Sequence, residues 1–126
     1  MKNAKKILIV EDEKVLSDLV ENEFDSMGFD ARVAGDGELA MKLARSFDPD
    51  VIMLDLILPK KGGLDVLKEL KIDPALKTIP VIVLSNLAGD ESIRMAMTYG
   101  ADDYFIKTQS SIFEIIGKVQ KRLERS

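Results

Sequence analysis

Residues 51–63, Val-Ile-Met-Leu-Asp-Leu-Ile-Leu-Pro-Lys-Lys-Gly-Gly, constrain the fold more than any other stretch of this chain. The first four are apolar, a run too short for a helix and typical of a strand buried on both faces. Asp55 follows directly, and Pro59 then indicates a loop. In open α/β sheets ligands bind at this end of the strands, where a carboxylate needs a partner. Asp55 is therefore predicted to be a reactive group rather than a helix cap.

Short apolar runs alternate with helical patterns along the whole chain. Strands are predicted at residues 6–10, 31–34, 51–54, 81–84 and 103–106. Strands that alternate with helices favour a parallel sheet covered on both faces. The expected fold class is α/β, a single doubly wound (βα)5 domain with a five-stranded parallel sheet, comprising residues 1–126. Apolar residues spaced three and four apart are predicted to lie on the core-facing sides of the helices. They are Val15, Leu16, Leu19, Val20, Phe24, Met27, Leu39, Met97, Ile112, Phe113, Ile116, Val119 and Leu123.

The composition excludes several kinds of chemistry. The chain has no cysteine and no histidine, which excludes disulfides, thiol nucleophiles, Ser-His triads and the usual zinc sites. No apolar run approaches the roughly 20 residues that span a bilayer, and no signal peptide is visible, so we expect a cytoplasmic protein without a membrane partner. The net charge of -4 argues against direct nucleic-acid binding.

Polar residues stand where four of the predicted strands end: Glu11-Asp12, Asp55, Ser85 and Lys107. The carboxyl ends of parallel strands share one edge of the sheet, so these side chains should converge. Clustered carboxylates repel one another, and Mg²⁺, which prefers oxygen ligands, would relieve this. An aspartate beside Mg²⁺ can attack a phosphoryl group, with a lysine and a hydroxyl stabilising its charge.

Each of these residues also has a purely structural interpretation. Glu11, Asp12 and Glu13 could be acids in the first turn of a helix, where they favour its dipole. Ser85 could cap a helix, and Lys107 could be a solvated surface lysine. Their joint position at strand ends favours the functional interpretation.

Over its whole length the chain resembles the receiver domain of bacterial two-component response regulators, of the chemotaxis-regulator-like type. The resemblance implies the strand order 2-1-3-4-5. It also implies a signalling switch, not an enzyme for external metabolites, that takes a phosphoryl group from a histidine kinase or histidine phosphotransferase and hydrolyses it slowly. The matching residues are Glu11-Asp12, Asp55, Leu58-Pro59, Gly63, Ser85, Gly100-Ala101, Tyr104 and Lys107.

The resemblance assigns a role to each matching position at the expected metal site. Asp55 would be the phosphoacceptor. Asp12 and Asp55 would bind Mg²⁺ together with the backbone carbonyl of Ile57, and Glu11 would contact the ion through water.

A second group would bind and report the phosphoryl group. Ser85 and Lys107 would contact it, and Ser85 with Tyr104 would form the switch. The face made by the fourth helix, the fifth strand and the last helix would then act on a downstream protein or output domain, or mediate phosphorylation-dependent homodimerisation. Taken alone, Tyr104 would be interpreted as an ordinary half-buried strand tyrosine.

The chain departs from the family pattern at three places. In the family this lysine is usually followed by a proline whose peptide bond is cis. Here Thr108 follows Lys107, so a trans bond is expected. Asn86 replaces a small residue and would partly screen the acceptor. Lys60 and Lys61 add positive charge near it.

Ile57 and Leu87 would flank the path of the water that hydrolyses the phosphoryl group, with Asn86 beside them. Both side chains are aliphatic and cannot orient a water, which predicts a slowly decaying phosphoprotein.

Two other classes of protein share parts of this pattern. Aspartyl-phosphate hydrolases carry a second aspartate two residues after the nucleophile, where this chain has Ile57. Flavin-binding electron carriers of similar topology have a phosphate loop rich in Ser, Thr and Gly after the first strand, where this chain has Glu-Asp-Glu. No output domain is recognisable, so a stand-alone receiver and a piece of a longer regulator both remain open.

Overall fold

The computed structural model describes residues 4–124, and within them five strands alternate with five helices. The predicted strands are confirmed to within one residue at each end. The elements are β1 (Lys6–Val10), α1 (Lys14–Ser26), β2 (Asp30–Ala34), α2 (Gly37–Phe47), β3 (Val51–Leu54), α3 (Gly63–Ile72), β4 (Val81–Ser85), α4 (Asp90–Thr98), β5 (Asp103–Ile106) and α5 (Ile112–Glu124).

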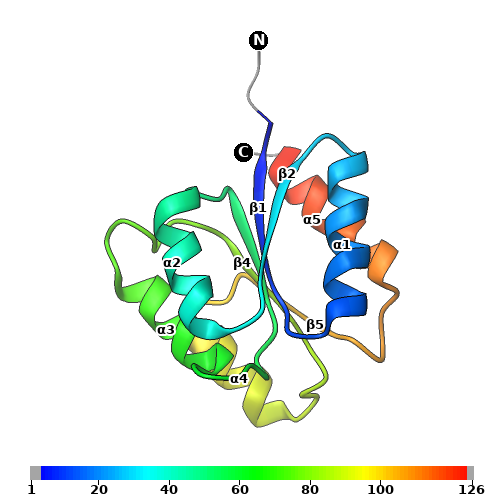
Figure 1. The fold of residues 1–126 in the computed structure, drawn as a ribbon. Coiled ribbons are helices and arrows are strands. Elements are labelled where there is room, and N and C mark those ends of the chain that lie inside the picture. Colours follow the sequence, from blue (N-terminus) through cyan, green and yellow to red (C-terminus); the bar gives the residue numbers. More distant parts are fainter. Residues whose placement is uncertain (1–3, 125–126) are drawn as a thin grey trace.

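The strands form one parallel sheet in the order β2-β1-β3-β4-β5, as the resemblance implied (Figure 1). In the register of the central strands, Val10 is level with Leu54, and Leu54 with Val83. The residues that follow β1 and β3 therefore meet at one edge of the sheet. This edge lies at the end of the sheet opposite to the one at which β1 begins (Figure 1).

Two apolar layers cover the sheet because successive side chains on a strand point to opposite faces. On β1, Leu8 and Val10 pack with residues of α2, α3 and α4, whereas Ile7 and Ile9 pack with residues of α1 and α5. Figure 1 shows the same division, with α1 and α5 together on one side of the sheet. All four strand residues are at most 2% exposed, so the sheet is rigid support for the groups at its edge.

Five apolar helix residues that were expected to face the core are wrongly assigned. On α1 the buried positions are Ser17, Val20 and Phe24, so Val15 lies on the flank of the helix and is 86% exposed. On α5 the buried stripe begins at Ile115 instead of Phe113. The apolar face of each helix is wider than the part that contacts the sheet. The spacing of apolar residues alone therefore does not say which side of that face is buried. The exposed five are Val15, Leu19, Leu39, Met97 and Phe113.

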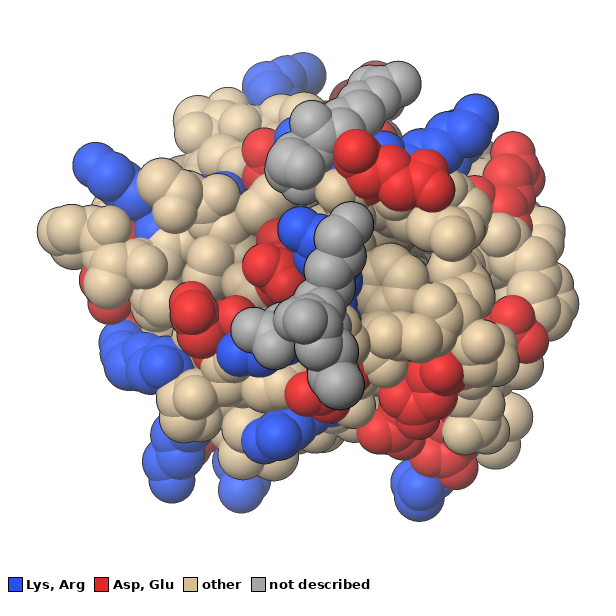
Figure 2. All heavy atoms as spheres, turned by 90° about the horizontal axis from the view of Figure 1, so that it is seen from above, with Lys and Arg blue, Asp and Glu red and all other residues tan. Residues whose placement is uncertain are grey.

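Charges of both signs are interspersed on the end of the molecule seen in Figure 2. Across residues 4–124, no helix is both long and apolar enough to span a lipid bilayer.

Candidate functional site

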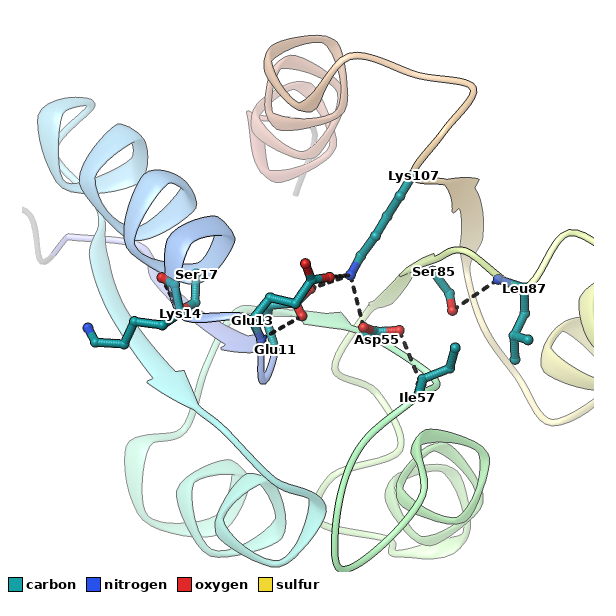
Figure 3. Close-up of polar contacts among 9 residues, drawn as sticks. All are labelled: Glu11, Glu13, Lys14, Ser17, Asp55, Ile57, Ser85, Leu87 and Lys107. Atoms are coloured by element: carbon teal, nitrogen blue, oxygen red, sulfur yellow. Dashed lines mark hydrogen bonds and ion pairs between the residues drawn. The ribbon is translucent and has the colours of Figure 1, made fainter.

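Backbone hydrogen bonds carry the sheet one residue beyond two of its strands and so hold the polar residues in place. The amide nitrogen of Asp55 donates to the carbonyl of Val10 at 3.0 Å, and that of Lys107 donates to the carbonyl of Ser85 at 2.9 Å. Figure 3 shows the side chains of Glu11, Asp55 and Lys107 converging at this edge. Residues far apart in sequence thus meet on short, rigid supports, as the sequence predicted.

Lys107 is the centre of the site. Its Nζ lies 2.7 Å from Glu11 Oε1, 2.9 Å from Asp55 Oδ2 and 3.0 Å from Glu13 Oε1 (Figure 3). The side chain is only 11% exposed, so the interpretation of Lys107 as a solvated surface lysine is wrong. Burial alone would lower the pKa of Lys107, but its hydrogen bonds to the three carboxylates outweigh burial and raise the pKa.

Glu11 lies at the buried end of this cluster. Burial raises its pKa, and the hydrogen bond from Lys107 opposes the rise. The amide nitrogen of Glu13 also donates to Glu11 Oε2 at 3.1 Å. Helix α1 begins at Lys14 and has no acid in its first turn, so the three acids precede the helix and do not lie in its first turn.

Three carboxylates offer a cation site. Glu11, Asp12 and Asp55 each place one oxygen so that the three oxygens lie within 4.8 Å of one another. Glu11 and Asp55 are buried and Asp12 is exposed, so one side is open to water. The backbone N–H of Ile57 donates a hydrogen bond to Asp55 Oδ1 at 3.1 Å, which puts the Ile57 backbone beside the Asp55 carboxylate. A few hard oxygen ligands with an open side suit Mg²⁺, and one lysine cannot neutralise three carboxylates.

The loop after β4 connects two of the predicted switch residues. Leu87 donates its amide nitrogen to Ser85 Oγ at 3.4 Å, and Tyr104 donates its hydroxyl to the Leu87 carbonyl at 2.5 Å. Ser85 is fully buried and ends β4, whereas the N-cap of α4 is Gly89, so Ser85 caps no helix. Within residues 4–124, Ser85 makes no hydrogen bond to Asp55. Burial, and secondarily the charge of Asp55, raises the pKa of Tyr104, which is half-buried.

The structure shows the contacts of the residues that depart from the family pattern. Lys60 Nζ lies 3.7 Å from Asp36 Oδ2, and Lys61 pairs with Glu69, so each added positive charge has its own acid partner. All peptide bonds of the described residues are trans, including the one that follows Lys107.

The side chains of Ile57, in the loop after β3, and of Asn86 and Leu87, in the loop after β4, are exposed. Their proposed effect on water access stays a prediction.

Glu13 is the contact that the sequence interpretation missed. The sequence suggests only an acid near a helix start, yet its carboxylate accepts a hydrogen bond from Lys107 Nζ at 3.0 Å, beside Glu11 (Figure 3). The sequence feature that pointed to this contact is the third acid in Glu11-Asp-Glu13. The loop conformation that brings Glu13 to Lys107 is not visible in the sequence.

A parallel sheet of order 2-1-3-4-5 with acids and a lysine at one edge defines a doubly wound protein with an acidic strand-end site. The chain matches the family described as response regulator receiver domain over residues 7–119, and it belongs to that family. Receiver domains are the phosphorylation-dependent switches of two-component systems and serve as signalling phosphoacceptors.

Among curated proteins, the chain is 36% identical over 121 residues to the DNA-binding dual master transcriptional regulator RpaA of Synechocystis, covering 96% of this chain and 50% of RpaA. It is 37% identical over 124 residues to the alkaline phosphatase synthesis transcriptional regulatory protein PhoP of Bacillus subtilis, covering 97% and 50%. The chain thus spans about half the length of these relatives.

Solved structures agree with this assignment. The receiver domain of the Francisella response regulator 1452 is 33% identical with a TM-score of 0.87, covering 96% of this chain and 98% of that one. The phosphorylated cyanobacterial phytochrome response regulator RcpA is 33% identical with a TM-score of 0.81, covering 97% of this chain and 92% of that one. The Mn²⁺-bound response regulator Rcp1 is 32% identical (TM-score 0.79; 93% and 90%).

Proposed function

We propose that Asp55 accepts a phosphoryl group from a phosphohistidine donor, a histidine kinase or histidine phosphotransferase, in a Mg²⁺-dependent reaction. The observation that carries this is the setting of Asp55: a carboxylate 5% exposed at a strand end, 2.9 Å from a lysine and within a cluster of three acids. Structures of similar proteins in phosphorylated and Mn²⁺-bound form support it.

The transfer needs one bond made and one broken. A carboxylate oxygen of Asp55 attacks phosphorus while the phosphorus–nitrogen bond of the donor breaks and its electron pair returns to the imidazole nitrogen. Lys107 donates a hydrogen bond to the transferred group, and the Ser85 hydroxyl turns toward it. Bound Mg²⁺ would neutralise charge on the phosphoryl oxygens. Its ligands would be Asp12, Asp55 and the carbonyl of Ile57, with Glu11 acting through water.

The switch follows from the contacts of the loop after β4. If Ser85 turns toward a phosphoryl group, the Leu87 amide N–H loses its hydrogen bond to Ser85 Oγ. The Leu87 carbonyl, which accepts the hydrogen bond from the Tyr104 hydroxyl, is then free to move. The face formed by α4, β5 and α5 would change and act on a partner, an output domain or a second copy of this chain. In this proposal the domain is cytoplasmic, binds no nucleic acid itself, and slowly removes its own phosphoryl group.

Intact mass after incubation with acetyl phosphate and Mg²⁺ tests the assignment. The wild type should gain one phosphoryl group, and it should gain none when Mg²⁺ is chelated. Asp55→Ala should gain none, whereas Asp65→Asn, which removes an exposed acid from the first turn of α3, should behave as wild type. An Asp55→Ala variant that is still phosphorylated would refute the proposal.

A further inference from the structure

Glu13 restrains the lysine of the acceptor site. We propose that Glu13 is a positioning residue that occupies one N–H of Lys107 before phosphoryl transfer, yields it to the incoming phosphoryl group, and thereby slows acceptance by Asp55. This inference rests on the proposed function of Asp55. Figure 3 shows Glu13 and Glu11 reaching the same Lys107 nitrogen.

The ammonium group of Lys107 is surrounded by carboxylates: it donates hydrogen bonds to Glu13 and Asp55 and forms an ion pair with Glu11. An ammonium group carries three N–H donors. Lys107 Nζ lies within hydrogen-bond distance of three carboxylates, Glu11 at 2.7 Å, Asp55 at 2.9 Å and Glu13 at 3.0 Å. A phosphoryl group that is to be bound by Lys107 therefore competes with these carboxylates for its N–H donors.

Glu13 is the partner that gives way most easily. Its side chain is 62% exposed, whereas those of Glu11 and Asp55 are 5% and 6% exposed. Water can solvate the carboxylate of Glu13 when it is released, so this pair is weak, whereas separating a buried pair leaves a charge without compensation. Its contact with Lys107 is also the longest of the three.

Before release, Glu13 opposes transfer in two ways. It occupies a donor that the phosphoryl oxygens need, and its negative charge stands at the solvent side of the site, where it repels a phosphorylated donor. Without Glu13, Lys107 is still held by Glu11 and Asp55, so the acceptor geometry is kept. Glu13 is the N-cap residue of α1 but makes no side-chain capping hydrogen bond, so its replacement removes no cap.

The test compares Glu13→Gln and Glu13→Ala with Asp25→Asn, which removes the same charge from an exposed position at the far end of α1. With acetyl phosphate and saturating Mg²⁺ at low ionic strength, both Glu13 variants should be phosphorylated about two- to fivefold faster than wild type. The gain should shrink as salt is added, because the contact is exposed. Asp25→Asn should match wild type.

Binding measurements without turnover separate this role from a general loosening of the site. Beryllofluoride, a phosphoryl mimic, should bind the Glu13 variants more tightly by a similar factor. Mg²⁺ alone should bind them as it binds wild type, because the three clustered oxygens belong to Glu11, Asp12 and Asp55.

Rates in both Glu13 variants equal to or below that of Asp25→Asn would overturn the inference while leaving the function of Asp55 intact. A wild type that takes no phosphoryl group, or an Asp55→Ala variant that takes as much, would overturn both proposals.

Discussion

The hydroxyl of Tyr104 on β5 donates a 2.5 Å hydrogen bond to the backbone carbonyl of Leu87, in the loop that follows β4. The amide nitrogen of the same Leu87 donates to Ser85 Oγ. One loop residue therefore joins the buried hydroxyl of Ser85 to an aromatic ring on the neighbouring strand. This gives a physical route from the site to the face formed by α4, β5 and α5.

Beryllofluoride with Mg²⁺ should change amide chemical shifts along α4, β5 and α5 in the wild type. In Tyr104→Phe these distant changes should shrink, because the ring no longer holds the Leu87 carbonyl, while changes in the loop after Asp55 should persist. Tyr99→Phe is the matched control, since no hydroxyl contact of Tyr99 is seen in residues 4–124. Distant changes that are unaltered in Tyr104→Phe would count against the route through Leu87.

Lys107→Met should destabilise the protein by about 3–5 kcal/mol, because it leaves Glu11 and Asp55 buried without their cation. Added Mg²⁺ should restore more stability to this variant than to wild type. Urea unfolding with and without Mg²⁺ measures both effects. Lys42→Met, at an exposed position of α2, is the control, and an equal loss there would remove the argument.

The contribution of Lys107 to the free energy of unfolding should fall at alkaline pH. The three carboxylates raise the pKa of Lys107 above the ordinary lysine value of 10.5, so its contribution is fully present below that pH and is lost as the pH rises through the folded-state pKa. The difference in free energy of unfolding between wild type and Lys107→Met should therefore be constant near neutral pH and narrow above pH 10.5. Subtracting the variant cancels the titration of the other lysines. A difference that widens there would contradict the ion pairs.

Gly63→Ala should destabilise the protein by about 3 kcal/mol, because a Cβ at this position would overlap the carbonyl oxygen of Asp55 and the backbone of Leu56. The overlap lies directly behind the acceptor, so phosphorylation should slow as well. Gly62→Ala is the adjacent control, with open space around its Cβ. Thermal unfolding of both variants gives the comparison, and equal losses would show that crowding at Gly63 is not the cause.

The phosphorylated protein should decay slowly, because the aliphatic side chains of Ile57 and Leu87 cannot orient a water for attack on phosphorus. Both are exposed, at 54% and 36%, so polar replacements should be tolerated. An Ile57→Asn, Leu87→Glu double variant should lose its phosphoryl group about tenfold faster. Loss of the phosphorylated mass over time measures this. A variant that decays no faster than wild type would show that other features set the lifetime.

The sequence by itself determined the strands and the polar residues at their ends. The central strands β1, β3 and β4 are buried on both faces, so each contains an unbroken apolar run such as Val51–Leu54, and the first polar residue marks its end. Parallel topology then brings Glu11, Asp55 and Lys107 to one edge whatever the details of the helices.

Tertiary structure decided the contacts that depend on how helices and loops pack. Helical spacing allowed Phe113 to face the core, but the sheet reaches Ile115 instead, because the angle at which a helix rests on its sheet is set by all of its neighbours. The pairing of Lys61 with Glu69 and that of Glu13 with Lys107 likewise depend on backbone turns in loops. Such turns are fixed by non-local packing, so no local pattern in the sequence specifies which charges meet.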